Sequence, residues 1–114
     1  MDKETLLNKM SQINGVQGAM ILNKEGLALA NSLPDSTDSE LISAVISDIF
    51  TKIDTQSKRM QRGKINKFIL ETDNDILSVV EAEVNGENLL VFGQFGKDIG
   101  VETITTALDN NLRG

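Results

Sequence analysis

The side chains that most often carry enzyme chemistry are missing from this sequence. It contains no histidine and no cysteine, so it lacks the commonest general base, the commonest metal ligand and any thiol nucleophile or disulfide. A Ser-His-Asp triad and a thiolate zinc site are excluded for the same reason. We therefore predict that the chain is not an enzyme and that it has no catalytic, metal-binding or cofactor-binding residues.

Two pairs of carboxylates, Asp73 with Asp75 and Glu81 with Glu83, could take part in acid–base chemistry. Such chemistry needs one carboxyl group held neutral in an apolar pocket, and the sequence indicates no such pocket. The segment TDNDILSVVEAE (72–83) also lacks the glycine at the sixth position of an EF-hand calcium loop. We interpret these carboxylates as solvated charges in a turn and on one face of a strand.

Three glycines in GQFGKDIG (93–100) could suggest a loop that binds phosphate. Their spacing matches neither G-x-G-x-x-G nor the P-loop. We expect instead that Gly93 allows another element to approach the backbone closely, and that Gly96 opens the turn into the last helix.

Five of the eleven basic residues lie within ten positions, at Lys58, Arg59, Arg62, Lys64 and Lys67. Cations are favoured at the C-terminal end of a helix, which explains the cluster without any partner. Lys58, Arg59 and Arg62 could alternatively dock on an acidic protein surface. A nucleic-acid partner is not expected, because the formal net charge is −6 and the only aromatic residues are four phenylalanines.

The length of 114 residues fits one domain, and we predict a single domain over residues 1–114. The N-terminus does not have the basic and then apolar pattern of a signal peptide. No apolar run approaches the ~20 residues that span a bilayer. We therefore expect a cytoplasmic protein with no direct membrane insertion.

Apolar periodicity predicts the order of the elements. A helix at about 3–13 is followed by short strands at 19–22 and 27–30, and a long helix runs from a capping box at Thr37 to about Arg62, with Gly63 as its stop. Strands follow at 65–72, 76–84 and 89–95, and then a helix at about 98–112. This order predicts an α+β fold: a five-stranded antiparallel sheet with the long helix on one face and the N- and C-terminal helices on the other.

The long helix carries more apolar surface than packing on one sheet requires. Its apolar side chains form two rows, the first with Leu41, Val45 and Ile49, the second with Ile42, Ile46, Phe50 and Ile53. One row can pack on the sheet of the same chain. The other needs either deeper burial within the chain or a second molecule.

The chain resembles the Roadblock family, known from dynein light chains, Ragulator subunits and bacterial regulators of gliding-motility GTPases. The resemblance rests on GVQGAMILNKEGLALANS (15–32), the Pro-Asp that follows, a long helix opening with SELISA (39–44), and the Asn-Leu-Leu-Val-Phe strand at 88–92. It covers about residues 6–112, and the order of elements carries the match more than any single motif.

This resemblance implies a non-enzymatic dimer in which the third strands of two subunits pair edge to edge and the long helices lie side by side. The partner would be a second copy or a related Roadblock subunit, and the dimer would bind a small Ras-like GTPase. Alternatives are a structural adaptor subunit of a larger assembly and, less favoured, a small-molecule sensor. The chain is shorter than the bacterial regulators at both ends, which puts stimulation of GTP hydrolysis in doubt. The expected dimer contacts are Ile42, Ile46, Ile49, Phe50 and Ile53 on the helix, with Phe68 and Leu70 on the strand.

Overall fold

A computed structural model, which describes residues 2–113, has the predicted α+β architecture. The elements are α1 (Lys3–Ser11), β1 (Val16–Leu22), β2 (Ala28–Asn31), α2 (Ser39–Arg59), β3 (Lys67–Glu71), β4 (Ile76–Val84), β5 (Glu87–Phe95), α3 (Val101–Leu108) and a π-helical end, η1 (Asp109–Arg113). The predicted order of helices and strands is therefore confirmed. The third strand and the last α-helix are shorter than predicted.

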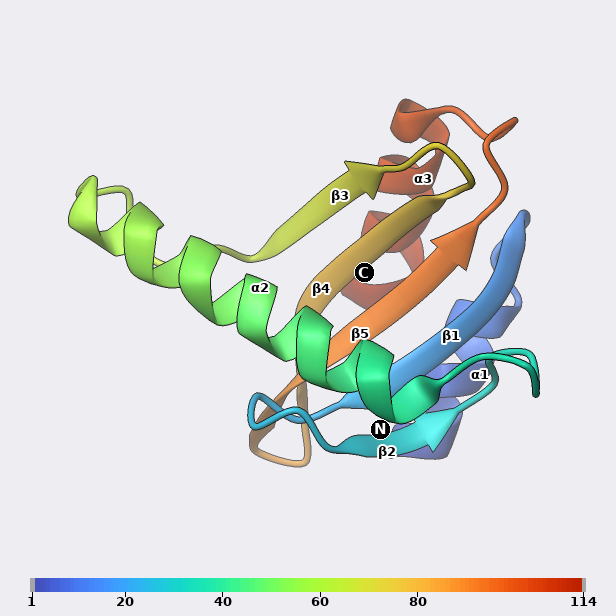
Figure 1. The fold of residues 1–114 in the computed structure, drawn as a ribbon, viewed down its shortest axis with the longest axis horizontal. Coiled ribbons are helices and arrows are strands. Elements are labelled where there is room, and N and C mark those ends of the chain that lie inside the picture. The colour runs from blue at the N-terminus through green and yellow to red at the C-terminus, as the bar shows by residue number, and fades with distance from the viewer. Residues whose placement is uncertain (1, 114) are drawn as a thin grey trace.

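The five strands form one antiparallel sheet in the order β2-β1-β5-β4-β3. Helix α2 crosses one face, and α1 and α3 cover the other (Figure 1). Each face has its own apolar core: Met10 and Ile104 lie in the core on the α1/α3 side, whereas Met20 and Phe92 lie in the core on the α2 side. The sheet is buried between two layers of helix, and β2 and β3 are its two edge strands.

The first hairpin and Gly93 behave as the sequence predicts. Asn23 Oδ1 accepts hydrogen bonds from the N–H groups of Glu25 and Leu27 at 3.1 and 2.9 Å, and this closes the turn between β1 and β2. On β5, a Cβ added to Gly93 would overlap the end of the Met10 side chain of α1. Glycine at this position therefore lets α1 lie directly against the sheet.

The N-cap of α2 was predicted wrongly. Asp38 caps the helix in place of Thr37, because its carboxylate accepts a hydrogen bond from Leu41 N at 3.1 Å. The N–H of Thr37 donates instead to Pro34 O at 2.9 Å, in the turn that precedes the helix. The capping box expected between Thr37 and Glu40 is therefore not formed.

The end of α2 also differs from the prediction. Gln61 adopts a left-handed φ of 62°, and the N–H of Arg62 donates to the carbonyl of Ser57 at 2.9 Å. This pattern is a Schellman motif, which satisfies carbonyl groups in the last turn. The helix consequently ends at Arg59, before the predicted limit at Arg62 and the predicted stop at Gly63.

Candidate interaction surface

Apolar side chains along one side of α2, here called its exposed row, remain open to solvent. Leu41 is 58% exposed, Val45 45% and Ile53 39%. Ile42 and Ile49 are partly buried beside them. A single exposed leucine on a surface needs no explanation, but successive apolar residues along one side of a helix indicate a contact surface.

The opposite side of α2 packs against the sheet through a mixture of large and small residues. Ile46 and Phe50 lie in the core of the α2 face and are almost fully buried. Ser43 and Ser47 are also buried, and their hydroxyls donate to the carbonyls of Glu40 and Ala44 in the same helix. Because their polar groups are satisfied within the helix, these serines can face the protein interior.

The placement of Ile46 and Phe50 changes the expected contact set. Both side chains complete the subunit's own core, so they are not available on the surface of an isolated subunit. Sequence periodicity gave the two apolar rows of α2 but not the rotation of the helix about its axis. The exposed surface is formed mainly by Leu41 and Val45, which belong to the other row, together with Ile53.

A groove of about 430 Å³ runs between the exposed row of α2 and the strands beside it. Leu41, Val45 and Ile49 form one wall, and Leu70 of β3 and Leu77 of β4 form the other. The few polar groups in its lining include Asp75, whose carboxylate is bound to Thr72 Oγ1 at 2.8 Å and to Gln94 Nε2 at 3.0 Å. The groove is therefore chiefly apolar, with its charged group already engaged by neighbours.

Strand β3 forms the open edge of the sheet next to this groove. Within residues 2–113 it pairs only with β4. Phe68 packs in the core beneath α2, with its ring 6.4 Å from that of Phe50, whereas Leu70 is 41% exposed. Leu70 and the unpaired backbone edge of β3 therefore lie across the groove from the exposed row of α2.

The basic cluster lies at the C-terminal end of α2, and much of it is engaged by neighbouring side chains. Lys58 pairs with Asp54 at 2.9 Å, and Arg59 Nη1 donates to Gln56 Oε1 at 3.0 Å. Two hydrogen bonds lower the pKa of Asp54 below its ordinary value: the one from Lys58 has the larger effect, and the one from Ile65 N the smaller. These contacts fit the interpretation that the cations stabilise the helix end, and they leave Arg59 and Arg62 as the more available cations for a partner.

Glu81 joins three elements at the same end of the molecule. Its carboxylate pairs with Lys24 in the β1–β2 turn and with Lys64 after α2, the latter at 3.2 Å. Burial by itself would raise the pKa of Glu81, but the hydrogen bonds from the two lysines outweigh burial and lower it. The expectation that Glu81 is a solvated charge is therefore wrong, because its side chain is 7% exposed.

In the part of the chain that the structure describes, no group of three or more acidic residues is arranged to hold a metal ion. No helix between residues 2 and 113 is both long and apolar enough to cross a membrane.

Comparisons with known proteins agree with the fold. The family model described as the Roadblock/LC7 domain matches residues 2–91. The protein MJ0310 of Methanocaldococcus jannaschii is 28% identical over 88 residues, which is 77% of this chain and 75% of that protein.

Two solved structures have the same fold at low sequence identity. MglB of Myxococcus xanthus has a TM-score of 0.81 and 8% identity, covering 96% of this chain and 89% of that one. The gliding protein MglB of Thermus thermophilus has a TM-score of 0.78 and 14% identity, covering 93% of this chain and 79% of that one. Since the family model spans most of the sequence and the architecture agrees with it, this chain belongs to the Roadblock/LC7 domain family.

Proposed function

We propose that this domain is a dimeric scaffold or regulator, without catalytic activity of its own, that binds a small Ras-like GTPase in the cytoplasm. The observation that carries the proposal is the exposed apolar row of α2 beside the open edge of β3. A lone subunit would leave both in water, where a free strand edge also invites aggregation.

A second copy of the chain would cover both features at once. Pairing of two β3 strands about a twofold axis would continue the sheet from one subunit into the next. The same arrangement would bring Leu41 and Val45 of α2, together with Leu70, against the partner's equivalent groove. Ile42, Ile49 and Ile53 would lie at the same contact, whereas Ile46, Phe50 and Phe68 would support it from the core beneath. A related Roadblock subunit could replace the second copy.

A Ras-like GTPase is the partner that the family resemblance favours. The similarity in fold to two MglB proteins, one of them described as a gliding protein, supports a regulatory role of the same kind. The helical face shared by two subunits would form the platform, with Arg59 and Arg62 at its ends as docking cations. Lys58 would contribute less, because it is paired with Asp54.

Two measurements test the proposal in sequence. Light scattering on the purified chain should give twice the monomer mass of 12.4 kDa, and a monomer at all concentrations would contradict it. Titration with Ras-like GTPases of the same organism, each loaded with GDP or with a non-hydrolysable GTP analogue, should then give different affinities. Equal affinities would leave nothing to regulate and would favour the structural adaptor.

A further inference from the structure

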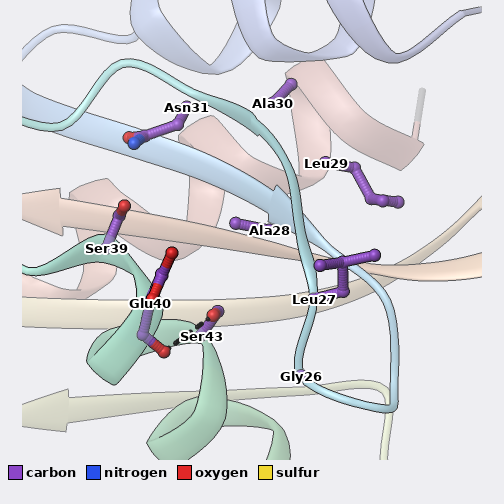
Figure 2. Close-up of a pocket in the computed structure, with 9 residues that line it drawn as sticks. All are labelled: Gly26, Leu27, Ala28, Leu29, Ala30, Asn31, Ser39, Glu40 and Ser43. Carbon is purple, nitrogen blue, oxygen red and sulfur yellow. Dashed lines mark hydrogen bonds between the residues drawn. The ribbon is translucent and has the colours of Figure 1, made fainter.

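The sheet has a second open edge, at β2, on the side away from β3. In the described chain β2 pairs only with β1. An open groove of about 580 Å³ lies between this strand and the first turns of α2. Figure 2 shows Ala28 to Asn31 on the strand side of the groove and Ser39, Glu40 and Ser43 on the helix side.

The backbone of β2 offers hydrogen-bonding groups to this groove. Ser32 N donates to Ala19 O at 2.8 Å, and the register places Ala30 opposite Ile21. Because hydrogen-bonded and non-bonded pairs alternate along antiparallel strands, the N–H and C=O groups of Asn31, between Ser32 and Ala30, point away from β1. The register shifts between Ile21 and Leu22, so this alternation does not extend to Leu29.

The rim of the groove is acidic. Glu40 lines it directly, and Glu25 and Asp38 are adjacent in sequence to the lining residues Gly26 and Ser39. The nearby cation, Lys24, is already paired with Glu81. The charge that a ligand would meet is therefore negative.

We propose that the β2 edge binds an extended segment of another protein whose side chains are basic at alternate positions, as a sixth strand of the sheet. Main-chain hydrogen bonds to Asn31 would hold the segment at the strand edge, as in other cases of strand addition. Side chains alternate between the two faces of a strand, so every second residue would point toward the α2 side, where Glu40 lies.

The acidic rim also argues against a second copy of this chain as the occupant. Two β2 edges brought together would place both sets of carboxylates close to one another, and like charges opposed across strands destabilise the pairing. Charge therefore favours a basic segment over self-association. Carboxylates that served only to prevent self-association would have no affinity for such a segment, and this difference can be measured.

The test uses the full chain, labelled with ¹⁵N, and a blocked hexapeptide of alternating lysine and valine. The peptide should bind with protection of the Asn31 amide from hydrogen exchange. Glu40→Gln should weaken binding about two- to fivefold, the range expected for loss of one exposed ion pair. The matched control is Glu102→Gln on α3, behind the sheet, which should leave the affinity unchanged.

Two control peptides separate strand addition from simple charge attraction. A peptide with glutamate in place of lysine should not bind, and a lysine peptide methylated on its backbone nitrogens should lose most of its affinity. Equal binding of the methylated peptide would overturn the proposal, as would absence of binding or protection confined to β3. The Asn31 amide reports on β2 whether the chain is a monomer or a dimer, so this test can fail independently of the proposed dimer.

Discussion

Replacing Val45 with aspartate should dissociate the proposed dimer and leave the subunit folded. Val45 is 45% exposed on α2 and lines the apolar groove. Complete burial of a valine stabilises by about 1.5–3 kcal/mol, so burial of the exposed part should contribute about 1 kcal/mol per subunit and about 2 kcal/mol per dimer. Two carboxylates placed in that contact should add at least about 2 kcal/mol of desolvation and repulsion. The total of about 4 kcal/mol corresponds to a several-hundred-fold higher dissociation constant.

The assay is light scattering on a dilution series, with circular dichroism to verify that each variant is folded. Val101→Asp is the matched control, because Val101 is 46% exposed on α3, on the opposite side of the sheet. It should keep the dissociation constant of the parent chain. If Val45→Asp stayed dimeric while folded, or if Val101→Asp dissociated equally, the assignment of the interface to α2 would be refuted.

Three further predictions concern the subunit itself. Ser78→Ala should raise the free energy of unfolding by about 1 kcal/mol in urea titrations, because the Ser78 hydroxyl is buried without a hydrogen-bond partner in the described chain; a loss of stability would contradict this. Gly93→Ala should destabilise by about 1–3 kcal/mol, because its methyl group would overlap the Met10 side chain; calorimetry should show a lower Tm. Glu81→Gln should lower stability at neutral pH. Since the pKa of Glu81 is lowered on folding, its contribution is present above the ordinary glutamate pKa and is lost as pH falls through the folded-state value. The parent and variant should therefore converge in acid, and a constant difference at all pH values would contradict the ion-pair explanation.

The order of elements could be predicted because each one has an unambiguous period or turn signal. The segment 76–84 is too rich in β-branched residues for a favourable helix, and the Asn-Gly at 85–86 fixes the hairpin that follows. The N-cap of α2 could not be predicted, because Thr37 and Asp38 are both good capping residues and only the preceding turn decides between them.

The exposed row of α2 could not be predicted for a different reason. Both rows of the helix are apolar, so hydrophobicity does not say which row meets the sheet. The rotation of α2 about its own axis is set by Ser43 and Ser47, which are buried against the sheet side although they are polar. A Cβ added to Gly26, in the β1–β2 turn, would lie 2.9 Å from Ser47 Oγ. The close approach of this turn to α2 needs small side chains on that side of the helix, and Leu41 and Val45 are therefore turned outward.

The arrangement of α1 and α3 on one side of the sheet has a practical consequence for tethering the domain. α1 begins at Lys3 and η1 ends at Arg113, and α1 and α3 contribute to the same core, behind the sheet as seen from α2 (Figure 1). A tag, a flexible linker or a sensor surface attached through either end is thus joined to the side opposite α2. Immobilisation through a terminus should leave the α2 side open to the solution, so the binding measurements can be made on a captured protein without screening attachment positions.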